Sequence, residues 1–333
     1  VEEYLRFVAE DSLLAEKCKR LRHGLADRLR HIDVRDRCLA RNSVTDVGRQ
    51  IETPEEYVRQ DPSAVALANL QRASQALRCL EEYGKIVDLT FARQIEQLRY
   101  DAYELERVVS LTVTCRPELA AVQLCVLIDG TRSLEEFTSR VERLIEAGVP
   151  MIQLRDKQLP DCDLRVRAQR LRKLARTTPT RILINDRPDI AHVVHADGVH
   201  TGQDDLSVSD ARRIVGLRAI VGRSTHSLRQ AQQAVLEGAD YIGVGPTFAS
   251  PTKNFEQFPG LNLLEEVQRE IRVPAFAIGG ITLERLPEVL ATGFCRVAVS
   301  SAVWQHDDAA GQAREFLRQL NALRAKHSSA PPT

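Results

Sequence analysis

Residues 181–205 read RILINDRPDIAHVVHADGVHTGQDD and contain two short apolar runs, each followed by polar residues. The first run leads into Asn185 and Asp186, and the second, at 198–201, leads into Gly202 and Asp205. Short, β-branched apolar runs of this kind are typical of buried parallel strands. If the two strands are neighbours, Asp186 and Asp205 meet on one rim of the sheet, as two oxygen ligands of a hard cation such as Mg²⁺ would. Taken singly, each aspartate would more commonly be a helix N-cap.

The charge of the chain is balanced, with 46 basic and 46 acidic residues among 333. This balance excludes a global field that would favour nucleic acid or acidic membranes, so we expect neither as a partner. No apolar run approaches the roughly 20 residues of a membrane span, and no leader is visible, so we expect a cytoplasmic protein. The seven cysteines include no C-x-x-C pair, which argues against a disulfide framework or a zinc site. The sequence starts at Val1 in a helical pattern, and we expect residues to precede it.

Residues 1–112 carry helical periodicity and no alternating strand pattern, which predicts an all-α domain followed by a linker at 113–120. This domain contains an internal echo. VEEY at 1–4 resembles LEEY at 80–83, and LRH at 21–23 resembles LRY at 98–100, at offsets of 79 and 77 residues. We interpret the echo as a duplicated helical hairpin. Arg72, Arg78 and Arg99 could line an anion pocket, although a solvated helix face is the commoner use of such residues.

Between residues 121 and 326, apolar runs alternate with amphipathic segments. The pattern predicts eight strands, at 123–129, 151–155, 181–185, 198–201, 219–223, 241–244, 275–278 and 296–299. Each strand is followed by a helical pattern, which predicts a compact (β/α)8 TIM barrel. A doubly wound sheet is the alternative, but it would normally carry a Gly-rich fingerprint that the segment after the first strand lacks. We expect residues 327–333 to form a flexible tail.

Polar clusters follow the predicted strands, where the catalytic face of a barrel lies. In QLRDK, residues 153–157, strand alternation aims Gln153, Arg155 and Lys157 to one side. Together with the two aspartates, these groups suit a phosphorylated anion and its magnesium. The pair Gly279–Gly280 and the segment beginning at Ser300 correspond to the usual phosphate site of a barrel. The sequence therefore predicts a site for two phosphorylated groups.

Several segments in chain order carry a resemblance to a known family. They are QLRDK (153–157), IND (184–186), DGVHTGQDD (197–205), GRSTHS (222–227), YIGVGPTFASPTK (241–253), AIGGI (277–281) and VSSAV (299–303). With them, the barrel domain resembles thiamine-phosphate synthase. That family joins hydroxymethylpyrimidine diphosphate to hydroxyethylthiazole phosphate with Mg²⁺, giving thiamine phosphate and pyrophosphate. The resemblance implies a dissociative reaction in which pyrophosphate leaves a pyrimidine carbocation that the thiazole nitrogen attacks. Because this nitrogen has no proton to lose, no general base is required.

The resemblance also implies roles for individual residues. The pyrimidine diphosphate would be bound by Gln153, Arg155, Lys157, Asn185 and Ser224. Mg²⁺ would be bound by Asp186 and Asp205. A loop covering the substrates would supply Ser250, Thr252 and Lys253. The thiazole phosphate would be held by Gly279, Gly280, Ser300 and Ser301. The residues expected to act in catalysis are Lys157, Ser224 and Lys253.

Two positions depart from the usual pattern, because Asp156 stands where glutamate is common and Ser250 where threonine is common.

The histidines offer an alternative metal site. His192 and His195 have helical spacing, but no third soft ligand stands at a recognisable distance. We therefore expect these two on a helix surface and His200 in a barrel layer near the site.

The helical domain resembles one fused ahead of thiamine-phosphate synthase in some bacteria and associated with phosphorylation of hydroxymethylpyrimidine phosphate. It contains no Gly-rich phosphate loop, so no kinase residue is carried over. Dimerisation or scaffolding is equally open for this domain, as is homo-oligomerisation of the chain. The alternatives for the whole protein are a bifunctional kinase and synthase, a thiazole tautomerase-like relative and a non-catalytic thiazole phosphate sensor.

Overall fold

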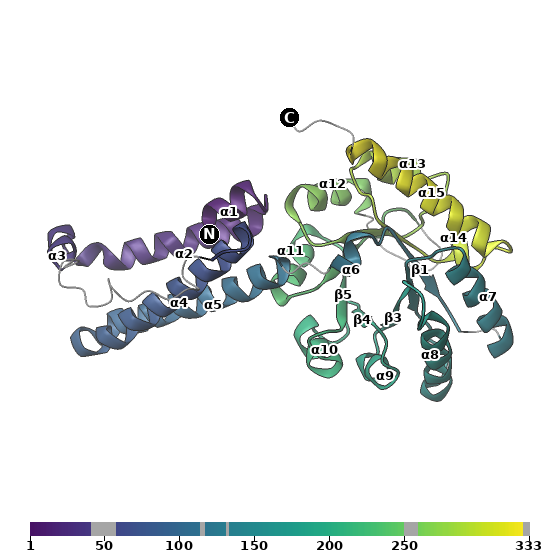
Figure 1. Ribbon diagram of the computed structural model, residues 1–333, viewed down its shortest axis with the longest axis horizontal. Helices are drawn as coiled ribbons and strands as arrows, with labels where there is room; N and C mark the ends of the chain where they lie inside the picture. The colour runs from purple at the N-terminus through teal and green to yellow at the C-terminus, as the bar shows by residue number, and fades with distance from the viewer. Residues whose placement is uncertain (41–57, 114–116, 131–132, 250–258, 329–333) are drawn as a thin grey trace. The chain divides into compact units, whose positions relative to one another are not determined.

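The computed structural model describes residues 1–40, 58–113, 117–130, 133–249 and 259–328 (Figure 1). The chain divides into two compact units, Val1–Thr114 and Cys115–Thr333. Within the described ranges, no helix is long and apolar enough to cross a membrane.

The first unit is helical throughout its described residues, which confirms the prediction of an all-α region. Its helices are α1 (Glu2–Phe7), α2 (Ser12–Arg28), the 3-10 turn η1 (Leu29–His31), α3 (Val34–Leu39), α4 (Pro62–Val87) and α5 (Leu89–Val113). Aspartate caps begin two of them. Asp11 accepts the N–H of Leu14, and Asp61 accepts the N–H of Ala64 just before Pro62 opens α4.

Helices α4 and α5 form a hairpin with only Asp88 between them, and α2 also packs on α5. The buried centre of this packing is formed by Leu77, Ile95, Leu98 and Ala102, with Leu21 and Leu25 of α2 packed against it. Full burial of one such leucine contributes about 1.5–3 kcal/mol. Apolar packing therefore holds the three helices together.

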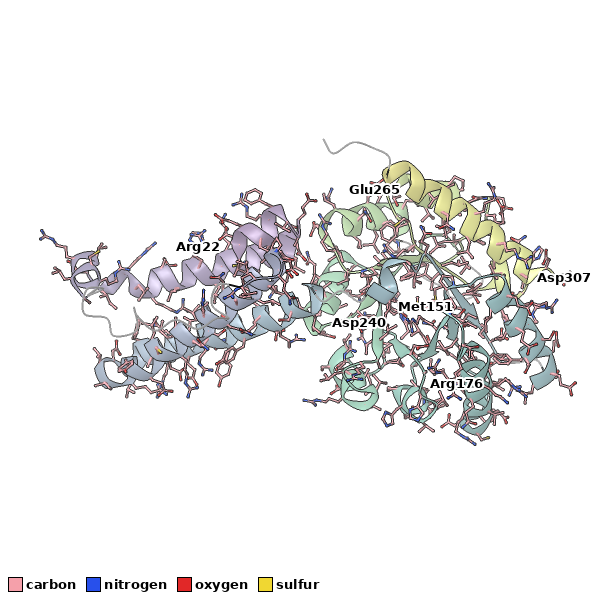
Figure 2. All side chains as sticks on the ribbon, in the orientation of Figure 1. Arg22, Met151, Arg176, Asp240, Glu265 and Asp307 are labelled. Carbon is pink, nitrogen blue, oxygen red and sulfur yellow. The ribbon has the colours of Figure 1, made fainter. Side chains whose placement is uncertain are left out.

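Two ion pairs occupy corresponding positions of the two sequence echoes. Glu2 of α1 accepts a hydrogen bond from Arg22 Nε of α2 at 2.9 Å, and Glu81 of α4 accepts one from Arg99 Nε of α5 at 2.5 Å. Arg22, labelled in Figure 2, is largely exposed, whereas Glu81 and Arg99 are buried. The offsets between the two glutamates and between the two arginines equal those of the sequence echoes, and this supports the proposed duplication.

The second unit is a closed barrel of eight parallel strands, each paired with the next in chain order and the last with the first. The strands are β1 (Leu124–Ile128), β2 (Met151–Leu154), β3 (Arg181–Asn185), β4 (Gly198–Thr201), β5 (Ile220–Thr225), β6 (Tyr241–Val244), β7 (Ala275–Ile278) and β8 (Val297–Val299). Closure confirms the (β/α)8 prediction and contradicts the doubly wound alternative, which needs an open sheet.

Helices cover the outside of this barrel (Figure 1). They are α7 (Leu134–Glu146), α8 (Asp161–Ala175), α9 (Pro188–Val193), α10 (Val208–Val215), α11 (Leu228–Glu237), α12 (Gly260–Glu270), α13 (Leu286–Ala291), α14 (Ser301–Trp304) and α15 (Ala309–Ser328). The short helix α6 (Pro117–Ala120) precedes β1 and contributes Leu119 to the barrel interior. Ser133, Ser207 and Ser227 cap α7, α10 and α11 through their hydroxyl oxygens. Helix α6 falls within the stretch 113–120 that we expected to be a linker.

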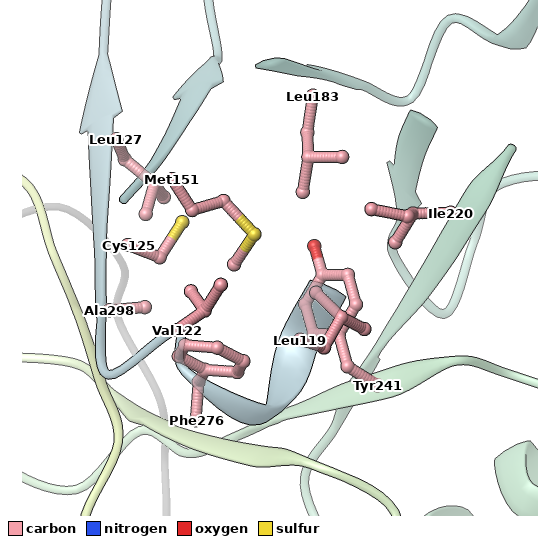
Figure 3. Packing of buried hydrophobic residues seen from close by; sticks show 10 residues of the cluster. All are labelled: Leu119, Val122, Cys125, Leu127, Met151, Leu183, Ile220, Tyr241, Phe276 and Ala298. Atoms are coloured by element: carbon pink, nitrogen blue, oxygen red, sulfur yellow. The ribbon is translucent and has the colours of Figure 1, made fainter. Parts of the chain in front are cut away.

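The barrel interior is filled from nearly every strand. Met151 of β2, which Figure 2 labels, belongs to a cluster there that also contains side chains from six other strands and from α6. The cluster in Figure 3 consists of Leu119, Val122, Cys125, Leu127, Met151, Leu183, Ile220, Tyr241, Phe276 and Ala298. Such a packed layer closes the inside of the barrel, so a site on this unit must lie at an end of the strands.

Candidate active site

Interior side chains change from apolar to polar toward the carboxyl ends of several strands. Met151 of β2 is followed two residues later by Gln153, and Leu183 of β3 is followed by Asn185. Residues two apart in a strand face the same side. The apolar member of each pair belongs to the core cluster, whereas the polar member lines a cavity. The sequence therefore places a polar layer directly on the apolar core.

The cavity above this layer has a volume of about 300 Å³, enough for a small ligand. It brings together eight of the residues predicted to bind substrates. They are Gln153, Arg155, Asn185, Ser224, Gly279, Gly280, Ser300 and Ser301. The individual roles of these residues stay predictions, but segments separated by up to 148 residues in the chain now share one space. Ser250, Thr252 and Lys253 lie outside the described residues.

The two predicted metal ligands lie close together, outside the lining of the cavity. Asp186 has a left-handed backbone, with φ of 60°, and its N–H donates to the carbonyl of His200 at 2.7 Å. Asp205 accepts the N–H of Gly202 at 3.0 Å. Burial raises the pKa of Asp186, and hydrogen bonding and charge repulsion from Asp205 raise it further. Two adjacent carboxylates of this kind fit Mg²⁺, which commonly uses one or two protein carboxylates and takes its other ligands from water or substrate.

Lys157 is next to this pair. Its Nζ lies 3.6 Å from Oδ2 of Asp186, and its side chain is 60% exposed. Strand β2 ends at Leu154, so the alternation that aims Gln153 and Arg155 into the cavity does not extend to Lys157. The expectation that all three face one side therefore holds for the first two, while the lysine stands beside the carboxylates.

Asp156 points away from the cavity. Its carboxylate accepts the backbone N–H groups of Gly130, Gln158 and Leu159 at 2.8–2.9 Å. Burial alone would raise the pKa of Asp156, but these bonds and the charge of Arg167 lower it below its ordinary value. Aspartate at this position therefore shapes the loops after β1 and β2.

The turn after β7 presses against the segment after β6. Gly279 and Gly280 both have positive φ, of 105° and 64°. A Cβ on Gly280 would lie 2.8 Å from the carbonyl oxygen of Ala249, so only glycine fits. On the neighbouring β8 side, the Ser300 hydroxyl donates to the carbonyl of Leu127 at 3.2 Å, and α14 starts at the next residue. Backbone groups of both segments therefore lie at the cavity wall, as a phosphate site requires.

His200 is buried inside the barrel near the site, as predicted. Its Nδ1 lies 2.8 Å from the Tyr241 hydroxyl, and its Nε2 lies 2.9 Å from Oγ of Ser224. By contrast, His192 and His195 are exposed on or just after α9. Among the described residues, no group of three His, Cys, Asp or Glu side chains could hold a metal ion. The histidine metal site is therefore not formed in the part of the chain that the structure describes.

The side chains that line the cavity also include His226 and Arg285, to which the sequence analysis assigned no role in the site. His226 Nδ1 lies 2.5 Å from the carbonyl oxygen of Gly245. Arg285 donates to the carbonyl of Gly280 at 3.1 Å, and its guanidinium lies over the Phe248 ring at 5.1 Å. His226 stands in the motif at 222–227 and could have been found from its place after β5. No motif surrounds Arg285.

Two of the three arginines that could line an anion pocket in the helical unit pair with carboxylates. Arg99 is buried against Glu81, and Arg78 pairs with Glu82 at 3.0 Å. Both cations are therefore already neutralised by carboxylates.

Comparison with known proteins covers both units. A family model described as thiamine monophosphate synthase matches residues 124–303, and one described as the ThiD2 family matches residues 1–108. The thiamine-phosphate synthase of Rhodopirellula baltica is 40% identical over 317 residues, which are 92% of this chain and 84% of that protein. That of Synechocystis sp. is 40% identical over 324 residues, which are 97% of this chain and 92% of the relative.

A solved structure agrees with the sequence comparison for the barrel. The thiamine phosphate pyrophosphorylase from Pyrococcus furiosus matches with a TM-score of 0.55 and 31% identity, over 61% of this chain and 96% of that one. The resemblance predicted from the loop motifs is thus confirmed by relatives whose similarity extends through the helical unit as well. On this identity and coverage, the chain belongs to the thiamine-phosphate synthase family.

Proposed function

We propose that the barrel unit joins hydroxymethylpyrimidine diphosphate to hydroxyethylthiazole phosphate, forming thiamine phosphate and releasing pyrophosphate. The observation that carries this proposal is the shared cavity. Its polar groups from β2, β3 and β5 stand in one space with the glycine turn after β7 and the start of α14. Such a site can hold a diphosphate and a second phosphate at once. A synthase acting on soluble phosphorylated substrates would work in the cytoplasm.

The groups around the cavity suit departure of an anion. Arg155 lines the cavity and Lys157 stands at its rim beside Asp186. Cations and hydroxyls placed where negative charge develops lower the barrier to loss of pyrophosphate. Asp186 and Asp205 would hold Mg²⁺, which neutralises charge on the leaving pyrophosphate when it is bound.

Orientation supplies the second part of the proposed mechanism. The attacking thiazole nitrogen carries a lone pair and no proton, so the site needs no base. It needs the thiazole nitrogen to be held over the exocyclic methylene of the pyrimidine cation while the bond between them forms. Backbone at Gly279–Gly280 and Ser300–Ser301 would anchor the thiazole phosphate, and Gln153 and Asn185 would orient the pyrimidine. Holding two reactants in place replaces a collision in water by a reaction within one complex.

Pyrophosphate release by the full chain tests this function. We expect release that requires both substrates and Mg²⁺, and that falls by at least about 100-fold in Asp205→Ala, the loss typical of removing one charge-stabilising group. Asp204→Ala is the matched control, because Asp204 is the exposed neighbour in the same loop. Release without the thiazole phosphate, or equal loss in both variants, would contradict the proposal.

The same preparation separates the alternatives. A sensor would bind thiazole phosphate in calorimetry and release no pyrophosphate with both substrates present. A bifunctional enzyme would make thiamine phosphate from the pyrimidine monophosphate and ATP, whereas the barrel activity alone requires the diphosphate.

A further inference from the structure

We propose that Tyr241 is a positioning residue for this reaction, which through His200 fixes the Ser224 hydroxyl as a hydrogen-bond donor toward the substrate. The proposal deepens the proposed function and rests on it. It concerns a tyrosine of the barrel core that does not itself line the cavity.

Tyr241 begins β6 and is 2% exposed. Its ring meets Phe276 edge to face at a centroid distance of 5.5 Å and lies against His200 at 5.4 Å. Figure 3 shows its hydroxyl pointing into the barrel interior, away from the β6 backbone. A buried phenol requires a polar partner, and His200 is within hydrogen-bond distance.

The neighbouring strand makes room for this contact. Gly222 on β5 is paired with His200 on β4 in the sheet. A Cβ on Gly222 would lie 2.1 Å from Cζ of Tyr241, so the tyrosine ring occupies the space that a side chain on β5 would fill. The phenol thereby reaches across one strand to the histidine. With any larger residue at position 222, the ring and His200 could not take these positions together.

The direction of each hydrogen bond follows from donor and acceptor chemistry. Burial raises the pKa of Tyr241 well above its ordinary value, so the phenol keeps its proton. We assign the phenol proton to Nδ1 of His200, because the interaction with the Gln153 side chain lowers the pKa of Tyr241, as donation to the phenol oxygen does. A neutral imidazole that accepts at Nδ1 carries its hydrogen on Nε2.

The last link reaches the cavity. In this tautomer, Nε2–H of His200 donates to Oγ of Ser224, which lies 2.9 Å away. A hydroxyl that accepts this bond still has its own hydrogen, and Ser224 lines the cavity. That hydrogen is then directed at an acceptor in the cavity, such as an oxygen of the leaving diphosphate. With the opposite tautomer, Ser224 would donate to His200 and present only lone pairs to an anion.

The test combines kinetics with the tautomer of His200 in the full chain. Tyr241→Phe keeps the ring and removes the hydroxyl. We expect kcat for pyrophosphate release to fall about 10- to 100-fold, the range seen when an orienting partner is lost, with KM changed less than kcat. Tyr83→Phe is the control, since Tyr83 is 73% exposed on α4 of the helical unit.

A mutant cycle with Ser224→Ala separates positioning from a merely structural role. If Tyr241 acts through Ser224, Tyr241→Phe should cost little once the serine hydroxyl has been removed. Equal losses of kcat with serine and with alanine at position 224 would overturn the proposal.

Nitrogen-15 NMR of the ring nitrogens reads the tautomer directly, with the His200 signals assigned by their absence in His200→Gln. We expect the hydrogen on Nε2 in the wild type and a mixture in Tyr241→Phe. A hydrogen on Nδ1 in the wild type would overturn the proposal even if the variant did not fold. The spectrum needs no turnover, so absence of pyrophosphate release would count against the proposed function and leave the tautomer as a separate result.

Discussion

Nζ of Lys157 lies 3.6 Å from Oδ2 of Asp186, at the carboxyl ends of β2 and β3. Asp205 interacts with Asp186 through a side-chain hydrogen bond and raises its pKa, so two carboxylates meet beside this lysine. The cluster therefore carries excess negative charge that a bound divalent cation would balance. The thermal stability of the barrel should therefore depend on pH and on Mg²⁺.

We expect Asp186→Asn to raise the Tm of the barrel at pH 7 in metal-free buffer. A raised pKa means that the folded protein binds a proton at Asp186 more tightly than the unfolded chain does, so its ionised form costs stability at neutral pH. That cost disappears as the pH falls toward the ordinary value of 3.8. Each kcal/mol of relief should move Tm by about 2–4 °C. Mg²⁺ should stabilise the wild type and leave the variant unchanged.

Asp189→Asn is the control, with the opposite sign. Arg187 lowers the pKa of Asp189, so its ionised form stabilises the fold above that pKa, and neutralising it should lower Tm at pH 7. If Asp186→Asn lowered Tm in the same way, the result would show that Asp186 and Asp205 do not destabilise the fold by repelling each other.

We expect Gly280→Ala to weaken binding of the thiazole phosphate. Alanine would be held at φ of 64°, which costs about 1–2 kcal/mol, and its Cβ would press on the Ala249 carbonyl at 2.8 Å. Movement of the turn away from the cavity should raise KM for this substrate by roughly 10-fold, the equivalent of about 1.4 kcal/mol. Steady-state kinetics with the other substrate saturating would measure it.

Gly148→Ala separates crowding from backbone conformation. Gly148 also has positive φ, and a Cβ there meets nothing within 4 Å. This control should lose stability through its backbone and keep its KM. A similar KM for Gly280→Ala and the wild type would show that the turn does not contact the ligand.

The short apolar runs were sufficient to predict all eight strands, because each is bounded by polar residues and buried along most of its length. Asn185 and Ser224 were predicted through the resemblance of the loop motifs, and both stand at strand ends, which fall on the rim of any parallel barrel. The contact of Tyr241 with His200 could not be predicted. It joins β6 to β4 across Gly222 of β5, and it depends on the registers between these three neighbouring strands, which the sequence pattern does not specify.

Arg285 was missed because its place depends on tertiary structure alone. It stands just ahead of α13, in a stretch that reads as an ordinary helix start. The fold brings it to Gly280 and Phe248. We expect Arg285→Ala to raise KM for the thiazole phosphate by about fivefold with little change in kcat, since an exposed cation contributes at most about 1 kcal/mol.

Arg272→Ala serves as the comparison for Arg285. Arg272 also donates to a backbone carbonyl, that of Gln268 at 3.2 Å, but it does not line the cavity. Equal KM values for the two variants would remove Arg285 from the binding site.

In the helical unit, the two equivalent ion pairs should differ sharply in their contribution to stability. Arg99 and Glu81 are 5% and 4% exposed, so Arg99→Ala removes the buried partner of a buried carboxylate and leaves it with Lys85, which is half-exposed at 3.3 Å; the unit should be destabilised by about 3 kcal/mol. Arg22 is 59% exposed, so Arg22→Ala should cost less than about 1 kcal/mol. Urea unfolding of the full chain, followed by helical circular dichroism, would compare them.

Arg99 lowers the pKa of Glu81, so the contribution of the buried pair should be present above the ordinary value of 4.5 and be lost as the pH falls through the lowered pKa. Equal costs for the two arginine variants at pH 7 would show that burial does not distinguish the two ion pairs.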